Sequence, residues 1–255
     1  MNTDRDWSRW AADDPYYGVL SLDKFRAKNL SAVARKEFFE SGAAHMQKII
    51  STVFSSAISN IRLSSALDFG CGVGRLLIPL AQHADMAIGV DISQEMLDEA
   101  ARNASNTGTS NIRLLLSDDG LTQIPSNISF IHSCLVFQHI PWHRGRWILR
   151  KLAEKVDADG HVAIQLLTAT SASRLTQILT KARYAFPPIH WVRNVLKHRP
   201  ALDPVMQLNV YDLETMLADL RDLGFASPTV LGEPSAMKDF TSVYVIAQRS
   251  ATPRG

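Results

Sequence analysis

Acidic side chains and glycines stand at the ends of two apolar runs in this chain. Asp68 precedes Gly70, Gly72 and Gly74 in the stretch LDFGCGVG, and Asp91 ends the run MAIGVD, 21 residues after Gly70. Glycine lets the backbone turn tightly and lets a ligand approach the main chain without a Cβ between them. A strand, such a turn and a helix form a ligand cradle, and an acid about 20 residues further on fits a nucleoside ribose. The pattern therefore predicts a site for a cofactor that carries a nucleoside.

The carboxylate in front of the glycines bears on which cofactor fits. A dinucleotide site typically has the spacing G-x-G-x-x-G and holds a pyrophosphate, whereas the glycines here are spaced G-C-G-V-G. Asp68 at the mouth of the loop would repel a pyrophosphate and attract a cation. S-adenosylmethionine carries an ammonium and a sulfonium and has no phosphate. The charge of Asp68 therefore favours S-adenosylmethionine.

His139, in the stretch VFQHIPWHRG, is the candidate catalytic residue. It follows an apolar run that we expect to form the fourth strand, at the edge of the sheet where α/β proteins bind ligands. Histidine titrates near neutral pH, which suits a general base for a hydroxyl acceptor. The alternative interpretation is a histidine that only fixes its loop.

Short β-type runs alternate with helical patterns from residue 65 onward, which is typical of a parallel sheet with helices on both faces. Two strand patterns near the C-terminus are separated by a loop too short for a crossover helix, so we expect them to pair antiparallel. The fold class is therefore α/β, a Rossmann-like, doubly wound, seven-stranded sheet that is mostly parallel with an antiparallel last pair. The expected strands are 66–69, 86–93, 112–117, 128–137, 161–168, 227–232 and 241–249, and the expected helices are 74–84, 94–105, 144–156 and 211–225.

Two regions lie outside this sheet and divide the chain. We expect a helical lid or cap over residues 1–60, the Rossmann-like domain over 61–168 and 207–250, and a substrate-binding insertion over 169–206. From residue 171 to 200 the insertion holds six basic residues, no acid and three aromatic residues. An acidic small molecule or glycan is the favoured partner of this segment, and an anionic membrane surface and nucleic acid are the other interpretations.

The stretches LDFGCGVGRLLIPLA and AIGVDISQEMLDEAARNA resemble the class I S-adenosylmethionine-dependent methyltransferases, above all the small-molecule enzymes of bacteria. The resemblance covers residues 65–168 and implies S-adenosyl-L-methionine as cofactor, with S-adenosyl-L-homocysteine as product. It also implies roles for individual residues. Asp68, Gly70, Cys71 and Gly72 would hold the methionine half, Asp91 the ribose hydroxyls, Ile92 and Asp118 or Asp119 the adenine, and Phe137 would lie near the methyl-bearing sulfur.

The resemblance leaves the methyl acceptor open. The fourth strand is not followed by an Asn/Asp-Pro-Pro-aromatic run, which argues against methylation of adenine in nucleic acid or of glutamine in proteins. No Pro-Cys pair follows it either, which argues against a cytosine-C5 mechanism through a cysteine nucleophile. The leading hypothesis is an O-methyltransferase that acts on a hydroxyl of a small molecule or sugar, with His139 as base. An amine acceptor, an RNA or protein acceptor, and a cofactor-binding protein without turnover stay open. The candidate substrate contacts are Trp10, Tyr16 and Tyr17 in the N-terminal region and Tyr184, Trp191, Arg183 and Arg193 in the insertion.

Composition adds only broad limits. Of the 255 residues, 46% are hydrophobic and 20% are charged, which is ordinary for a protein with a sizeable core. The N-terminus lacks the pattern of a signal peptide, no stretch is apolar enough to span a membrane, and no metal-ligand spacing is present. We therefore expect a cytoplasmic protein without a metal, and the sequence does not indicate an oligomeric state.

Overall fold

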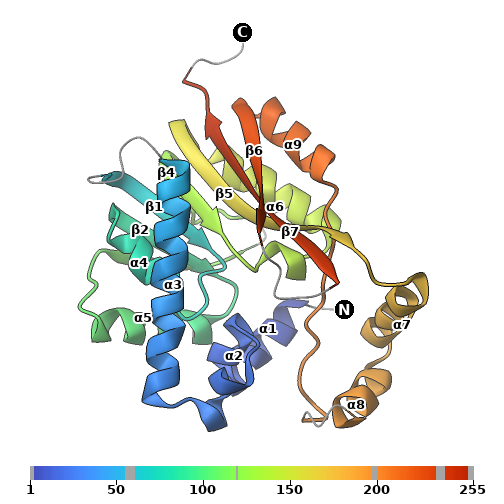
Figure 1. The fold of residues 1–255 in the computed structure, drawn as a ribbon. Helices are drawn as coiled ribbons and strands as arrows, with labels where there is room; N and C mark the ends of the chain where they lie inside the picture. The colour runs from blue at the N-terminus through green and yellow to red at the C-terminus, as the bar shows by residue number, and fades with distance from the viewer. Residues whose placement is uncertain (1–2, 55–60, 119, 197–199, 234–238, 252–255) are drawn as a thin grey trace.

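The computed structural model of the chain describes residues 3–54, 61–118, 120–196, 200–233 and 239–251 (Figure 1). Within these ranges a seven-stranded sheet has the strand order β3-β2-β1-β4-β5-β7-β6. The first five strands are parallel, and β7 runs antiparallel to both β5 and β6. This arrangement confirms the predicted fold class. The strands are β1 (Leu63–Phe69), β2 (Ala84–Asp91), β3 (Ile112–Leu116), β4 (Ile128–Ser133), β5 (Val156–Thr170), β6 (Phe225–Glu233) and β7 (Phe240–Arg249).

Helices pack on both faces of the sheet, and each face has its own core. Apolar side chains of α3 and α4 cover one face, and those of α6 and α9 cover the other. The α-helices are α1 (Thr3–Asp13), α2 (Pro15–Val19), α3 (Ala32–Val53), α4 (Leu77–Ala81), α5 (Gln94–Asn106), α6 (Trp142–Glu154), α7 (Arg174–Ala185), α8 (Pro187–Leu196) and α9 (Leu213–Asp222). Short 3₁₀ turns are η1 (Asp23–Phe25), η2 (Ala27–Asn29) and η3 (Phe137–His139).

The junction of β2 and α5 illustrates how local chemistry places a candidate site residue. Met96, Leu97 and Ala100 form the buried side of α5. Ser93 caps the helix, because its Oγ accepts a hydrogen bond from the Met96 N–H at 3.4 Å. The chain therefore passes directly from the carboxyl end of β2 into the helix, and Asp91 is held at that edge of the sheet.

The fourth strand is shorter than the sequence predicts. It ends at Ser133 rather than at residue 137, and the chain then turns through Leu135, whose φ of 62° leaves the extended region, into η3. The first helix after the glycines is also short, since α4 begins only at Leu77. Both departures lie in the loops that surround the ligand edge, where the backbone is shaped by turns rather than by periodic packing.

The two regions outside the sheet contain helices, which are α1 to α3 in the N-terminal region and α7 and α8 in the insertion. Helices α1 and α2 lie beneath the carboxyl edge of β1 and β2, and the insertion forms a hairpin of α7 and α8 that projects from the body of the molecule (Figure 1). The segment after the hairpin returns along the N-terminal helices, where Arg9 donates to the Leu202 carbonyl at 2.8 Å and Arg26 pairs with Asp203 at 2.7 Å.

Candidate active site

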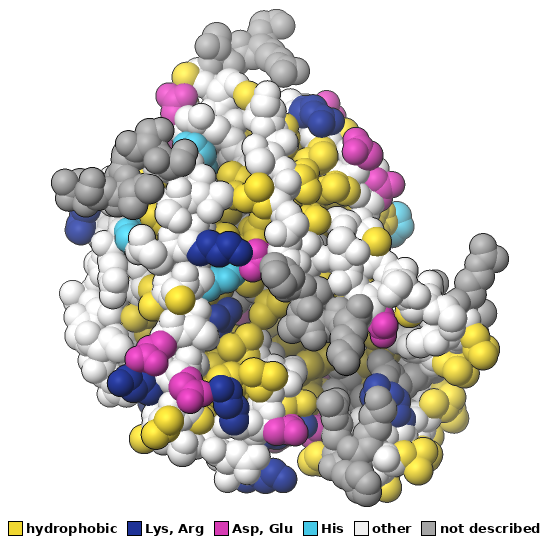
Figure 2. All heavy atoms as spheres, viewed as in Figure 1, with side chains coloured by type: hydrophobic (Ala, Val, Ile, Leu, Met, Phe, Trp, Pro, Cys, Tyr) yellow, Lys and Arg dark blue, Asp and Glu magenta, His cyan; other side chains and the backbone are white. Residues whose placement is uncertain are grey.

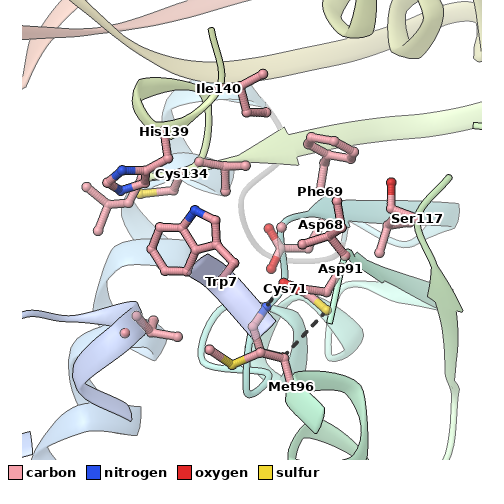
Figure 3. A pocket seen from close by; sticks show the side chains of 18 of the residues that line it. Trp7, Asp68, Phe69, Cys71, Asp91, Met96, Ser117, Cys134, His139 and Ile140 are labelled. Atoms are coloured by element: carbon pink, nitrogen blue, oxygen red, sulfur yellow. Dashed lines mark hydrogen bonds between the residues drawn. The ribbon is translucent and has the colours of Figure 1, made fainter. Parts of the chain in front are cut away.

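A pocket lies at the carboxyl ends of β1, β2 and β4, where Figure 3 shows side chains from several loops pointing toward one another. The glycine loop, the start of α5, residues 134–136 and η3 form its walls, and α1 and α2 close one side. Asp119 lies outside the described residues. The predicted residues that line the pocket are Asp68, Gly70, Cys71, Gly72, Asp91, Ile92, Asp118 and His139.

The glycine loop is a cradle without room for side chains. Gly70 has a φ of 75°, and a Cβ built on it would lie 2.2 Å from Val136 Cγ2. Gly72 has a φ of 51°, and its Cβ would lie 2.7 Å from Val19 Cγ2. The N–H groups of Gly70 and Cys71 both donate to the Val90 carbonyl, at 2.7 and 3.0 Å, which ties the loop to β2. Glycine is therefore required at both positions for the loop to form.

Asp68 is buried, and a histidine that sequence reasoning missed holds its carboxylate. His132 Nδ1 lies 2.9 Å from Asp68 Oδ1, and neither side chain is more than 3% exposed. On its other side, His132 Nε2 is 3.4 Å from the Tyr244 hydroxyl, which is 2.8 Å from His45 Nε2. Asp68 on β1 and His132 on β4 are paired directly in the register of these two parallel strands, so this register is the feature that brings them together.

Asp91 is positioned by the backbone. Its Oδ2 accepts from the Gly72 N–H at 2.9 Å and its Oδ1 from the Ser93 N–H at 3.0 Å. Burial raises the pKa of this carboxyl above its usual value, and these hydrogen bonds oppose that shift. A carboxylate offers about four acceptor positions. The backbone hydrogen bonds do not use all of these positions, so Asp91 can still accept from a hydroxyl donor in the pocket.

Asp118 lies at the exposed rim of the pocket. Its carboxylate accepts from the Thr122 hydroxyl at 2.5 Å and from the Thr122 N–H at 3.0 Å. The hydrogen bond from the hydroxyl is the main reason that the pKa of Asp118 is lowered. Asp118 is therefore an ionised acceptor fixed by its own turn.

His139 reaches the pocket from η3 and is held on two sides. Its Nδ1–H donates to the Gln207 carbonyl at 2.7 Å, so Nε2 carries the lone pair, which faces the Gln138 amide nitrogen at 3.0 Å. Burial lowers the pKa of His139 to about 4. The Trp7 ring meets the imidazole edge-on, with 4.8 Å between centroids. The imidazole is therefore neutral near pH 7 with a fixed tautomer.

Three aromatic residues of the N-terminal region are packing residues rather than pocket residues. Trp10 and Tyr17 are buried against each other, with the Arg26 guanidinium 3.6 Å from the centroid of the Tyr17 ring. Tyr16 is buried as well, and its hydroxyl donates to Glu99 at 2.6 Å. None of these three residues lines the pocket. The same segment supplies Trp7 instead, which lines the pocket beside His139.

Phe137 and the described residues of the insertion also lie outside the pocket lining. Phe137 is fully buried against Phe69 and Tyr211, because β4 ends before it and η3 turns its ring into the core. Tyr184 accepts from the Leu208 N–H at 3.2 Å and so fixes the returning segment. Trp191 is 44% exposed and Arg193 is half-buried, both on α8, and the side chain of Arg183 is not among those described.

Further residues of the pocket carry charge or sulfur and were given no site role from the sequence. Arg144 forms a two-pronged ion pair with Asp4 of α1, at 2.6 and 3.0 Å. Arg75, directly after the glycine loop, is buried. Cys134 is half-buried at the pocket wall, and burial raises the pKa of its thiol to about 11.

Comparison with known proteins shows what this chain is similar to. A family model described as a methyltransferase domain matches residues 66–160. Magnesium-protoporphyrin O-methyltransferase from Synechocystis sp. (strain ATCC 27184 / PCC 6803 / Kazusa) is 28% identical over 113 residues, which are 44% of this chain and 49% of that one. The 23S rRNA (uracil(1939)-C(5))-methyltransferase RlmD of Marinomonas sp. (strain MWYL1) is 28% identical over 128 residues, which are 46% of this chain and 29% of that one. The matched segments thus span less than half the length of these curated relatives.

Solved structures extend the likeness to the whole fold. Magnesium protoporphyrin IX methyltransferase from Synechocystis PCC 6803 with bound SAM has a TM-score of 0.60 at 18% identity, and the match covers 98% of both chains. The N-methyltransferase NodS from Bradyrhizobium japonicum WM9 in complex with S-adenosyl-L-homocysteine has a TM-score of 0.59 at 15% identity, covering 98% of this chain and 99% of that one. The architecture around the pocket is therefore shared beyond the segment that the family model matches.

Proposed function

We propose that this chain, which matches a methyltransferase domain over residues 66–160 and shares the fold of a methyltransferase solved with bound SAM, is a class I S-adenosylmethionine-dependent methyltransferase that moves a methyl group to a hydroxyl of a small molecule. The observation that carries the proposal is the pocket in which two carboxylates, those of Asp68 and Asp91, flank a glycine cradle, with a neutral histidine on the opposite wall. When bound, the cofactor supplies a methyl group already activated on a sulfonium.

The residues of the pocket fit this cofactor in shape and charge. A Cβ on Gly70 or Gly72 would meet Val136 or Val19, so only glycine lets the loop follow its path along the pocket wall. Asp68, held by His132, supplies the negative charge for the ammonium group. Asp91 keeps acceptor positions for the two ribose hydroxyls, and Ile92 and Asp118 lie where an adenine would be received. These roles are part of the proposal.

His139 is the proposed general base. The Gln207 carbonyl keeps the proton on Nδ1, so Nε2 can accept the proton of an acceptor hydroxyl once the Gln138 amide moves aside. Its pKa of about 4 keeps it unprotonated at neutral pH and makes it a weaker base than free imidazole. Trp7, Ile140 and Ile148 add apolar wall beside it, which would exclude water from the acceptor.

Two acceptor classes compete. An oxygen acceptor in a small molecule is supported by the relative named as a magnesium-protoporphyrin O-methyltransferase, and a glycan hydroxyl belongs to the same class. RNA is the second candidate, because other curated relatives are named as 23S rRNA methyltransferases. An amine acceptor would need no base, so His139 would be idle in that reaction.

The test is transfer of label from methyl-labelled S-adenosylmethionine into a cell extract separated into small molecules, glycan, RNA and protein. The proposal expects label in the small-molecule or glycan fraction, loss of transfer for Asp68→Asn, and slow transfer with undiminished cofactor binding for His139→Gln. Label confined to RNA or protein would overturn the choice of acceptor. Equal rates of methyl transfer for wild type and His139→Gln would show that His139 is not the general base.

A further inference from the structure

The hairpin of α7 and α8 exposes more large apolar side chains than any other part of the described chain. Leu175 and Leu179, one helical turn apart on α7, are 65% and 59% exposed. Ile189, Val192 and Leu196 follow the spacing i, i+3, i+7 on α8 and are 46%, 60% and 75% exposed. Phe186 between the two helices and Trp191 and Val195 on α8 are each at least 44% exposed as well. We call these eight residues the hairpin surface.

Exposed apolar side chains that gather in one place mark an interaction site. Figure 2 shows hydrophobic side chains along the lower right edge, where Figure 1 places α7 and α8. None of the hairpin residues named above lines the pocket. No described helix is both long and apolar enough to cross a membrane. The surface is thus separate from the cofactor site and lies on short helices.

Charge decides which partner fits this surface. Between residues 171 and 200 the chain has six basic residues and no acid. Short helices that combine apolar side chains with Lys and Arg bind in the interface of anionic membranes, where each basic residue near the surface adds attraction. Trp191 suits the same place, because its ring is amphipathic.

Two other partners fit the same observations less well. A second copy of this chain would bring together two segments whose sequences each have six basic residues and no acid, because a two-fold interface pairs the same patch with itself. A nucleic acid is bound mainly through polar and positively charged side chains, whereas the strongly exposed side chains here are aliphatic and aromatic. We therefore propose that the hairpin surface docks on an anionic lipid bilayer.

The hairpin is linked to the wall of the pocket through the segment that follows α8. The segment that follows α8 contacts the N-terminal helices, which hold Trp7 at the pocket wall: Arg9 on α1 donates to the Leu202 carbonyl, and Arg26 pairs with Asp203. Asn194 on α8 donates to the Ala201 and Asp203 carbonyls, at 3.2 and 3.3 Å, so hydrogen bonds connect the hairpin to this segment. The docking surface does not depend on which atom of the acceptor receives the methyl group.

Vesicle binding tests the proposal directly. The full chain is mixed with vesicles of phosphatidylglycerol and phosphatidylcholine, or of phosphatidylcholine alone, and the bound fraction is measured by flotation. Trp191 provides a second readout, because insertion shifts its fluorescence to shorter wavelength, and Trp191→Phe removes that part of the signal. The variants Leu175→Ser/Leu179→Ser and Val192→Ser/Leu196→Ser remove apolar area. The control is Val33→Ser, since Val33 is 67% exposed outside the hairpin.

The proposal expects binding to the anionic vesicles that weakens with salt and falls about tenfold or more in both hairpin variants, but not in Val33→Ser. Thermal unfolding and S-adenosylmethionine affinity should stay as in wild type, because the replaced side chains are exposed. Equal binding to neutral vesicles, or none to either, would overturn it. An oligomer that dissociates in the hairpin variants, or RNA binding that they abolish while vesicle binding is absent, would also overturn it.

Discussion

Replacing Gly70 by alanine should destabilise the protein through two separable costs. The first is the φ of 75°, which an L-residue adopts at a cost of about 1–2 kcal/mol. The second is the new Cβ, which would lie 2.2, 2.8 and 3.0 Å from Val136 Cγ2, Cγ1 and Cβ. Rotation of the valine does not clear it, because both methyl groups and the stem are too close, and overpacking typically costs about 1–3 kcal/mol. Gly70→Ala should therefore lose about 2–5 kcal/mol in total.

Two other glycines separate these costs. Gly108 has a φ of 69° with nothing within 4 Å of its Cβ, so Gly108→Ala should lose only the backbone cost of about 1–2 kcal/mol. Gly232 has open space and no positive φ, so Gly232→Ala should be neutral or stabilising by up to about 1 kcal/mol. Adding Val136→Ala to Gly70→Ala should relieve the clash.

Urea unfolding followed by circular dichroism gives the free energy of unfolding for each variant. Calorimetry gives the affinity for S-adenosylhomocysteine, which should fall in Gly70→Ala because the loop cannot keep its path. If Gly70→Ala were no less stable than Gly108→Ala, the packing of Val136 over the loop would not be as tight as the structure has it, and the cradle argument would be refuted.

Three further predictions concern charged and titrating groups. Asp91→Asn should weaken S-adenosylmethionine binding about tenfold or more in calorimetry, because charge-assisted hydrogen bonds to the ribose are lost. An unchanged affinity would show that Asp91 does not bind the cofactor. His139→Gln should lower the transfer rate by about 10²–10⁴-fold. Since the pKa of His139 is about 4, the wild-type transfer rate should show no change due to titration of His139 between about pH 8 and 6. A change of rate in that pH range that is present in wild type and absent in the variant would contradict this. Hydrogen bonds from Arg146, and also from Arg150, lower the pKa of Asp219 in the folded protein. The ionised carboxylate of Asp219 therefore stabilises the fold above its unfolded pKa of about 3.9, and this stabilisation is lost as the pH falls through the lower pKa of the folded protein. Urea unfolding of Asp219→Asn should show lower stability at neutral pH and a shallower loss in acid; parallel pH curves would contradict that account.

The sheet could be predicted because buried strands and helices repeat their patterns along the chain. The runs that end at Asp68 and Asp91 are apolar, and glycines or a helix cap follow them, so the strand ends and the acids were placed together correctly. The register of β1 against β4 was not predicted, and His132 was missed for that reason. An isolated histidine in an apolar strand gives no sign of the carboxylate beside it in the next strand.

Irregular backbone accounts for the remaining differences. The positive φ of Leu135 ends β4 early and turns Phe137 into the core, and no periodicity signals such a residue. The N-terminal aromatics share one short stretch, so which of them faces the pocket depends on tertiary packing: Trp10 and Tyr17 surround Arg26, and Trp7 is left beside His139. Side chains that meet through loops are thus the part of a site that sequence patterns specify least.

The central claim is that a carboxylate beside a bare glycine turn receives a cationic methyl donor. Isothermal titration of the cofactor-free protein with S-adenosylmethionine, S-adenosylhomocysteine and a nicotinamide dinucleotide tests it most directly, with Asp68→Asn measured alongside. The account predicts saturable binding of the first two, a clear loss in the variant and no binding of the dinucleotide. Binding of the dinucleotide alone, or equal affinity for S-adenosylmethionine in wild type and variant, would contradict it.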